Sequence, residues 1–158
     1  MQDDKLWGKY RAEVLDVNDP DMRGRVKVKC ESLMPDKPEL GWAESCFMPR
    51  EFNLPRKGDN VWIEFEDGDI TLPIWVGIMP TRKYVKEFLF SDYGDRTNYD
   101  PKIHILRSAN HQGIHLMDGA KSGENEVRIK DATGSTTRLD SKTGDIILKS
   151  TRYIQENP

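Results

Sequence analysis

The last third of the chain repeats one pattern. Two mostly apolar residues stand two positions apart, and a turn-forming segment follows each pair. This alternation is typical of a β-strand with one buried face. The last four pairs begin 13, 10 and 9 residues apart (114 to 127, 127 to 137, 137 to 146). Each segment offers only about two inward side chains, too few to stabilise a solitary two- or three-stranded sheet in water. The pairs, in chain order, are Ile103 and Ile105, Ile114 and Leu116, Val127 and Ile129, Thr137 and Leu139, and Ile146 and Leu148.

A repeat of this kind must stack on copies of itself, because a single chain of four or five rungs would make a thin, poorly buried solenoid. Composition points the same way. Only 36% of the residues are hydrophobic while 32% are charged, which is a low apolar content for a chain that closes a large core alone. We therefore expect residues 102–158 to stack on copies of themselves, and a homotrimer whose strands intertwine around one axis would bury the pairs of three chains against each other. The predicted trimer core consists of Ile114, Leu116, Val127, Ile129, Thr137, Leu139, Ile146 and Leu148.

The first 81 residues show a different pattern, with strand-like segments at 7–17, 25–30, 42–48, 61–66 and 74–76. Residues 58–77 predict a hairpin, in which alternating apolar residues lead into the turn formers Asp67, Gly68 and Asp69. Pro73 has no backbone N–H to donate, so it should lie at a sheet edge or at the start of the returning strand. Five short strands predict a small closed sheet, either a sandwich or a barrel. Composition alone does not separate a five-stranded Greek-key barrel from an SH3-like one.

Five blocks within these residues follow a specific order, namely 19–20, 24–28, 41–43, 54–69 and 72–77. Their sequence resembles the oligonucleotide/oligosaccharide-binding (OB) barrel of phage baseplate spike proteins. That family includes baseplate assembly protein V and the VgrG proteins of type VI secretion. The chain departs from the family pattern at Trp62 and Trp75, which stand where aliphatic residues are usual. We interpret this difference as a change in barrel packing.

The resemblance implies an all-β protein with an OB-type barrel at 1–81, a linker at 82–101 and the start of an intertwined trimeric β-helix at 102–158. Residues 82–90 show helical spacing and predict one short helix within that linker. The implied function is that of the central spike of a contractile phage tail, located in the virion baseplate and made in the host cytoplasm. Such a spike attaches to a trimeric hub protein and helps to pierce the host cell envelope. The needle expected here is short, so either a separate tip protein caps it or the sequence is part of a longer chain. The alternative is a VgrG-like spike of a secretion apparatus.

The residue pattern does not favour catalysis, a metal or a cofactor. His111 and His115 have a spacing that binds zinc on a helix, but their surroundings indicate a turn and a strand. On a strand, residues four apart stand about 13 Å from each other, too far to share one ion. His104 has no assigned role, and the His-x-His iron motif of some spike proteins does not occur. Acidic residues at 64–69 crowd the hairpin without building a glycosidase cleft.

Nucleic acid and membrane are disfavoured as partners. Aromatic residues at 10, 42, 62 and 75 are candidates for stacking bases, but the first 101 residues carry 15 Lys and Arg against 20 Asp and Glu. No segment approaches the ~20 apolar residues that cross a bilayer, so no stable membrane insertion is expected. The two cysteines, Cys30 and Cys46, lie in strand-like segments and are expected to be reduced and buried.

Overall fold

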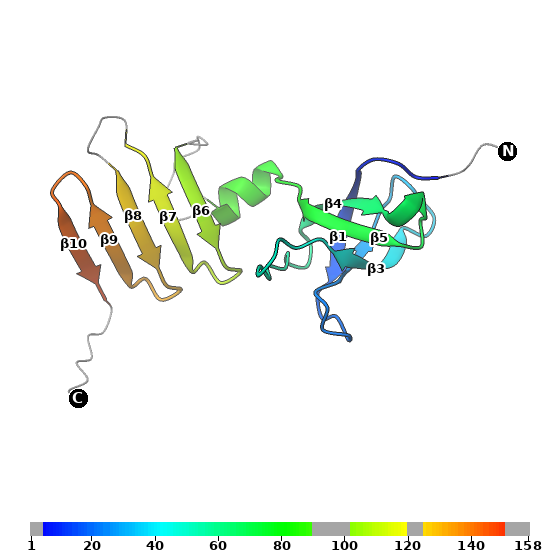
Figure 1. Cartoon of the computed structure of the whole chain (residues 1–158), viewed down its shortest axis with the longest axis horizontal. Coiled ribbons are helices and arrows are strands. Elements are labelled where there is room, and N and C mark those ends of the chain that lie inside the picture. The colour runs from blue at the N-terminus through cyan, green and yellow to red at the C-terminus, as the bar shows by residue number, and fades with distance from the viewer. Residues whose placement is uncertain (1–4, 90–101, 120–124, 151–158) are drawn as a thin grey trace. The chain divides into compact units, whose positions relative to one another are not determined.

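The computed structural model describes residues 5–89, 102–119 and 125–150, and the chain divides into two compact units, Met1–Arg82 and Lys83–Pro158. Both units are built mainly from β-strands (Figure 1). Most of the predicted linker, residues 90–101, and the polar tail, residues 151–158, lie outside the described residues. The predicted short helix is present as η2 (Tyr84–Leu89), a π-helical segment.

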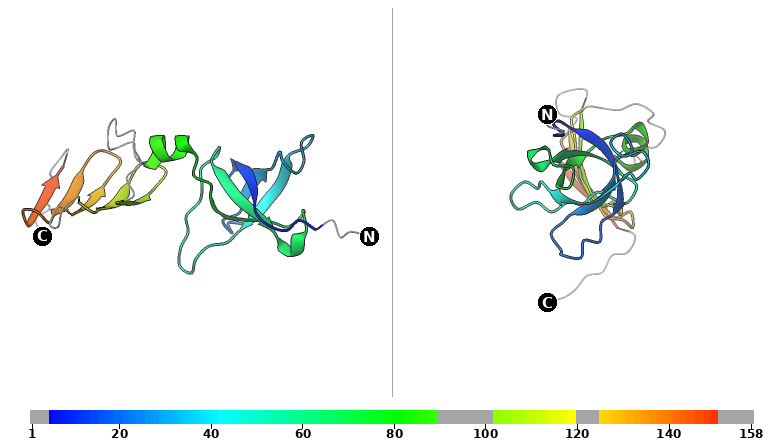
Figure 2. Two further views of the ribbon diagram at one scale, coloured as in Figure 1. Left: turned by 90° about the horizontal axis from the view of Figure 1, so that it is seen from above. Right: turned by 90° about the vertical axis from the view of Figure 1, so that its right-hand side faces the viewer.

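The first unit is a closed five-stranded barrel, as the strand pattern predicted. The strands follow one another around the barrel in the order β1-β2-β3-β5-β4. Figure 2 shows the ribbon in two further views. All neighbours are antiparallel except β3 and β5, which run parallel. Pairing of β1 with β4 closes the sheet on itself, so the barrel has no free edge. Its strands are β1 (Tyr10–Asp16), β2 (Val26–Lys29), β3 (Glu39–Ser45), β4 (Asn60–Phe65) and β5 (Pro73–Ile78).

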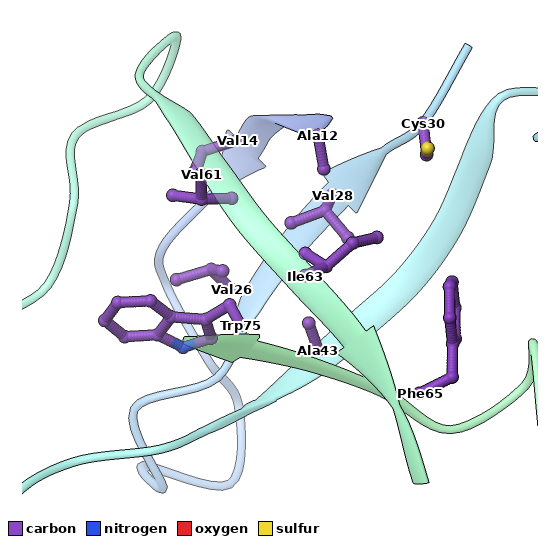
Figure 3. Close-up of a cluster of buried hydrophobic side chains, with 10 residues drawn as sticks. All are labelled: Ala12, Val14, Val26, Val28, Cys30, Ala43, Val61, Ile63, Phe65 and Trp75. Carbon is purple, nitrogen blue, oxygen red and sulfur yellow. The ribbon is translucent and has the colours of Figure 1, made fainter. Parts of the chain in front are cut away.

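Alternating residues of the five strands fill the barrel, and aliphatic side chains dominate its centre (Figure 3). Trp75 belongs to this core, where it is 7% exposed and its indole Nε1 donates a hydrogen bond to the Gly24 carbonyl at 3.2 Å. The Trp75 ring also packs edge-on against Phe47, at 5.4 Å between centroids. Trp75 is therefore part of the barrel packing. Trp62 lies instead on the outer surface of β4, where Arg11 stacks over its ring.

The β4–β5 connection follows the hairpin prediction. Asp67 and Gly68 take positive φ angles of 49° and 75° in the 3₁₀ turn η1 (Glu66–Gly68). The Asp69 carboxylate then accepts hydrogen bonds from the backbone N–H and the hydroxyl of Thr71, at 2.8 and 2.7 Å. Pro73 is the first residue of β5, as its missing N–H predicted.

Two strands differ from the prediction by three residues at an end, and the other three by one or two. β1 begins at Tyr10 rather than at residue 7, and β3 spans Glu39–Ser45 rather than 42–48. Because β3 ends one residue earlier than Cys46, that cysteine lies outside the sheet and is exposed, which contradicts its predicted burial. Cys30 is fully buried, as expected, and both thiols are free.

The β1–β2 loop is held by a carboxylate that acts as an internal anchor. The Asp19 side chain accepts hydrogen bonds from the Arg25 guanidinium at 2.6 Å and from the Arg23 backbone N–H at 2.8 Å. The Arg25 hydrogen bond is the main reason that the Asp19 pKa lies well below its ordinary value. Only 3% of the Asp19 side chain is exposed, so this ion pair is shielded from solvent.

The second unit is an open five-stranded antiparallel sheet in which consecutive strands are neighbours (Figure 1). Every pairing in it runs without a register shift. The single chain therefore forms a flat meander, and the intertwined trimeric β-helix remains an inference about its assembly. The strands are β6 (Ile103–Arg107), β7 (Gly113–Met117), β8 (Glu126–Lys130), β9 (Thr136–Asp140) and β10 (Asp145–Lys149).

Candidate functional site

The uninterrupted register of the second sheet gathers alternate residues onto one side, which we call the apolar face. Directly opposed pairs across the sheet include His104 with Leu116, and Ile114 with Ile129. Since every second residue of a strand shares a face, these pairings assign the whole set. All eight residues of the predicted trimer core lie on it. The apolar face consists of His104, Leu106, Ile114, Leu116, Val127, Ile129, Thr137, Leu139, Ile146 and Leu148.

Much of the apolar face is exposed in the single chain. Exposure is 46% for Leu116 and 52% for Ile129 in the middle of the sheet, and reaches 72% for Leu148 on the last strand. Isolated exposed leucines are ordinary, but a contiguous apolar patch over five strands is typical of an interaction surface. The face is thus a candidate for association with another polypeptide.

The sequence pattern placed the first pair of the repeat on the same face as the other pairs, and this assignment is wrong. Ile103 and Ile105 lie on the opposite face, because Ile105 pairs with His115 and Ile103 pairs with Met117. The first strand contributes His104 and Leu106 to the apolar face instead. Leu106 is 63% exposed.

Charged side chains dominate the middle of the opposite face. Glu126 forms ion pairs with Arg128 at 2.6 Å and with Arg138 at 3.5 Å, and Arg138 also reaches Asp140 at 3.4 Å. Arg128 and Arg138 oppose each other directly, which would be unfavourable without the two carboxylates. This arrangement is net neutral, and its side chains are partly buried, with 15% of Glu126 and 35% of Arg138 exposed. The sheet is therefore amphipathic, and the apolar face is the side that needs a cover.

The remaining histidines have structural environments. His115 is completely buried in β7, with Nε2 at 3.4 Å from Arg107 Nη2. His111 takes a positive φ of 63° in the β6–β7 turn and packs against the Phe88 ring of η2, at 5.5 Å between centroids. In the ranges that the structure describes, no group of three or more His, Cys, Asp or Glu side chains of one chain could hold a metal ion.

The acidic residues of the barrel hairpin serve the turn and the barrel surface. Asp69 caps the turn through Thr71, and Glu64 forms an ion pair with Lys9. A shallow surface groove of 560 Å³ lies beside β1, and it is bordered by Trp62, Lys29 and residues of β1. Lys29 in this groove pairs with Glu13 at 3.0 Å, so the charges there are largely compensated.

The aromatic residues proposed for base stacking do not form a common platform. Trp75 is in the core, and Tyr10 packs edge-on against Phe65 at 5.5 Å between centroids. Trp42 and Trp62 lie on β3 and β4, which are not neighbours in the barrel because β5 separates them. Arginines stack over both indoles. This geometry does not favour a single-stranded nucleic-acid surface.

Comparison with known proteins gives the class of this barrel. Residues 10–79 match the family model described as the type VI secretion system/phage-baseplate injector OB domain. The barrel spans the matched residues, so the fold and the sequence define the same module. No curated protein matches the chain.

The barrel thus matches the model of the injector OB domains, the family that the resemblance predicted. The match supports a structural role in a spike of the baseplate type. No helix within the described ranges is long and apolar enough to cross a membrane.

Proposed function

We propose that this chain is a homotrimeric central spike protein of a contractile phage tail. In this proposal the barrels attach to a trimeric hub protein of the virion baseplate. The second units of three chains form a needle that helps to penetrate the host cell envelope. A VgrG-like spike of a type VI secretion apparatus is the second candidate, because the matching family model covers both kinds of machine.

The observation that carries the proposal is the exposed apolar face, in a chain that also contains a family-matched barrel. Its central residues Leu116 and Ile129 are about half exposed in one chain, although they lie in the middle of a five-stranded sheet. Three copies arranged around an axis would turn these faces toward one another and remove them from water. The charged face, with Glu126, Arg128 and Arg138, would then form the outer surface.

The proposed role is mechanical. Strands of three chains that share one interior have little independent motion, so an axial force is distributed over many backbone hydrogen bonds. No catalytic step, cofactor or nucleic acid is part of this proposal. A protein that caps the needle tip is a further proposed partner.

Sedimentation equilibrium of the full chain at micromolar concentration tests the proposal. We expect the mass of a trimer, without a populated monomer. A monodisperse monomer with a folded second unit would contradict it. Negative-stain micrographs of the parent particle labelled with antibody against the chain would separate a phage baseplate from a secretion apparatus.

A further inference from the structure

The groove beside β1 has no part in the proposed spike. It lies on the outside of the barrel, where β1 runs between β2 and β4. Its volume of 560 Å³ falls within the range of small-molecule sites, which is about 300–1,000 Å³. Ala12 contributes to its lining and also belongs to the barrel core, so the base of the groove is part of the folded barrel. The groove is therefore complete within a single chain.

The register of three strands sets polar side chains side by side along the groove. Glu13 of β1 pairs with Asn60 of β4 on one side and with Lys29 of β2 on the other. Directly opposed residues have Cβ atoms about 4.5–5.5 Å apart, so the carboxylate, amide and ammonium groups form one continuous row. The Lys29 ammonium lies 3.0 Å from the Glu13 carboxylate and 3.4 Å from that of Glu31. The row thus offers both donors and acceptors of hydrogen bonds in fixed positions.

An indole ring borders the groove next to this row. Trp62 lies two residues from Asn60 on β4, so both side chains leave the barrel on its outer face. The Arg11 guanidinium lies 5.7 Å from the centroid of the Trp62 ring. A cation–π contact at an exposed site is weak, so the exposed Arg11 side chain can move aside for a ligand. Trp62 then presents a flat apolar surface beside the polar row.

We propose that this groove binds a neutral oligosaccharide. A pyranose ring has an apolar face of C–H groups, which stacks on an indole, and a rim of hydroxyls, which donate and accept hydrogen bonds. The Trp62 ring supplies the stacking surface. Glu13, Asn60 and Lys29 supply acceptors and donors at the spacing of neighbouring strands. The site lies within one barrel, so the inference does not depend on the proposed homotrimer.

Paired charges in the groove favour a ligand without charge. The lining residue Lys29 is paired with Glu13. The second lining lysine, Lys9, forms an ion pair with Glu64. A phosphate or an acidic sugar would have to displace these carboxylates or lie against them, which is unfavourable. A nucleic-acid strand would also need a second stacking ring, and Trp42 does not line the groove.

A glycan array probed with the full chain, followed by isothermal titration calorimetry, tests this site. We expect a neutral oligosaccharide to bind with a dissociation constant at or below about 1 mM. Added salt should change this constant little, because a neutral ligand has no charge to screen. Trp62→Ala should weaken binding at least about tenfold, because the stacking surface is lost. Glu13→Ala should weaken it at least about threefold, because an acceptor is lost.

Trp42→Ala is the matched control. Trp42 precedes the buried Ala43 on β3, so its ring also leaves the barrel on the outer face. Arg25 lies over that ring, 5.9 Å from its centroid, as Arg11 does over Trp62. This variant should bind as tightly as the wild type, and circular dichroism of every variant should show an intact barrel.

Three results would overturn the oligosaccharide site. They are the absence of binding to every neutral glycan on the array, an unchanged affinity in Trp62→Ala, and a preference for acidic glycans that weakens as salt is added. None of these results bears on the mass of the assembly, so they leave the proposed spike to its own test.

Discussion

Truncation of one leucine on the apolar face should weaken the trimer by a calculable amount. Leu116 lies on β7, inside the sheet, and is 46% exposed in the single chain. Complete burial of a leucine side chain contributes about 2 kcal/mol, so the exposed part contributes about 1 kcal/mol per chain on assembly. Leu116→Ala should therefore cost the trimer about 3 kcal/mol. At 1.4 kcal/mol per tenfold, the association constant falls roughly 100-fold.

Sedimentation equilibrium over a range of concentrations measures this constant. Lys149→Ala is the control, because Lys149 pairs with Thr136 on the opposite face and its change should leave the constant within about threefold. Circular dichroism of both variants would show that the sheet itself persists. An association constant that Leu116→Ala leaves unchanged would refute the apolar face as the trimer interface.

Three further predictions concern the barrel, and urea denaturation measures each. Asp19→Asn should destabilise the barrel at pH 7, because it removes the ion pair with Arg25. The ion pair lowers the folded-state pKa of Asp19, so its stabilisation is present above about pH 4 and is lost as the pH falls through that folded value. The free energy of unfolding of the variant should therefore depend less on pH in the acidic range than that of the wild type. Gly24→Ala places a Cβ 2.6 Å from an aromatic carbon and should cost at least about 2 kcal/mol more than Gly41→Ala, which shares a positive φ but has open space; equal losses would contradict the steric argument. Trp75→Phe removes the hydrogen bond to the Gly24 carbonyl and should cost about 1 kcal/mol beyond the lost packing.

Strand alternation predicted the barrel well where only one face of a strand is apolar. Val61, Ile63 and Phe65 are all buried, while Trp62 between them faces outward. The outward position of Trp62 follows from the same alternation. The interpretation of Trp62 as a change in barrel packing came from the family pattern and did not use this alternation. The family pattern supplied the closed barrel topology, which five short strands by themselves do not determine.

The first strand of the second unit was assigned to the wrong face because apolar residues occupy both of its sides. Ile103, Ile105 and Leu106 are all apolar, so a period of two fits either assignment. Only pairing with β7 shows that Leu106 and His104 share a side with Ile114. A recognisable turn type at 108–112 would have fixed the register of the hairpin and thereby the face of each residue. The sequence shows no clear turn type there.

Cys46 shows that the end of a strand is difficult to predict from sequence alternation. Its neighbours alternate as in a strand, yet β3 pairs only as far as Ser45, which lies opposite Trp75. Where a strand ends depends on the length of its partner, and that length is a tertiary property. Residues at the ends of strands are accordingly the least predictable from a single sequence.

The unbroken pairing of β6 through β10 also bears on how such a chain can change during evolution. Because side chains alternate with a period of two and no bulge interrupts the ladder, duplication or deletion of one complete hairpin leaves every other residue on its original side. The sheet can thus be lengthened or shortened in modular steps. The barrel has no such freedom, since the contact of β1 with β4 requires a fixed number of strands.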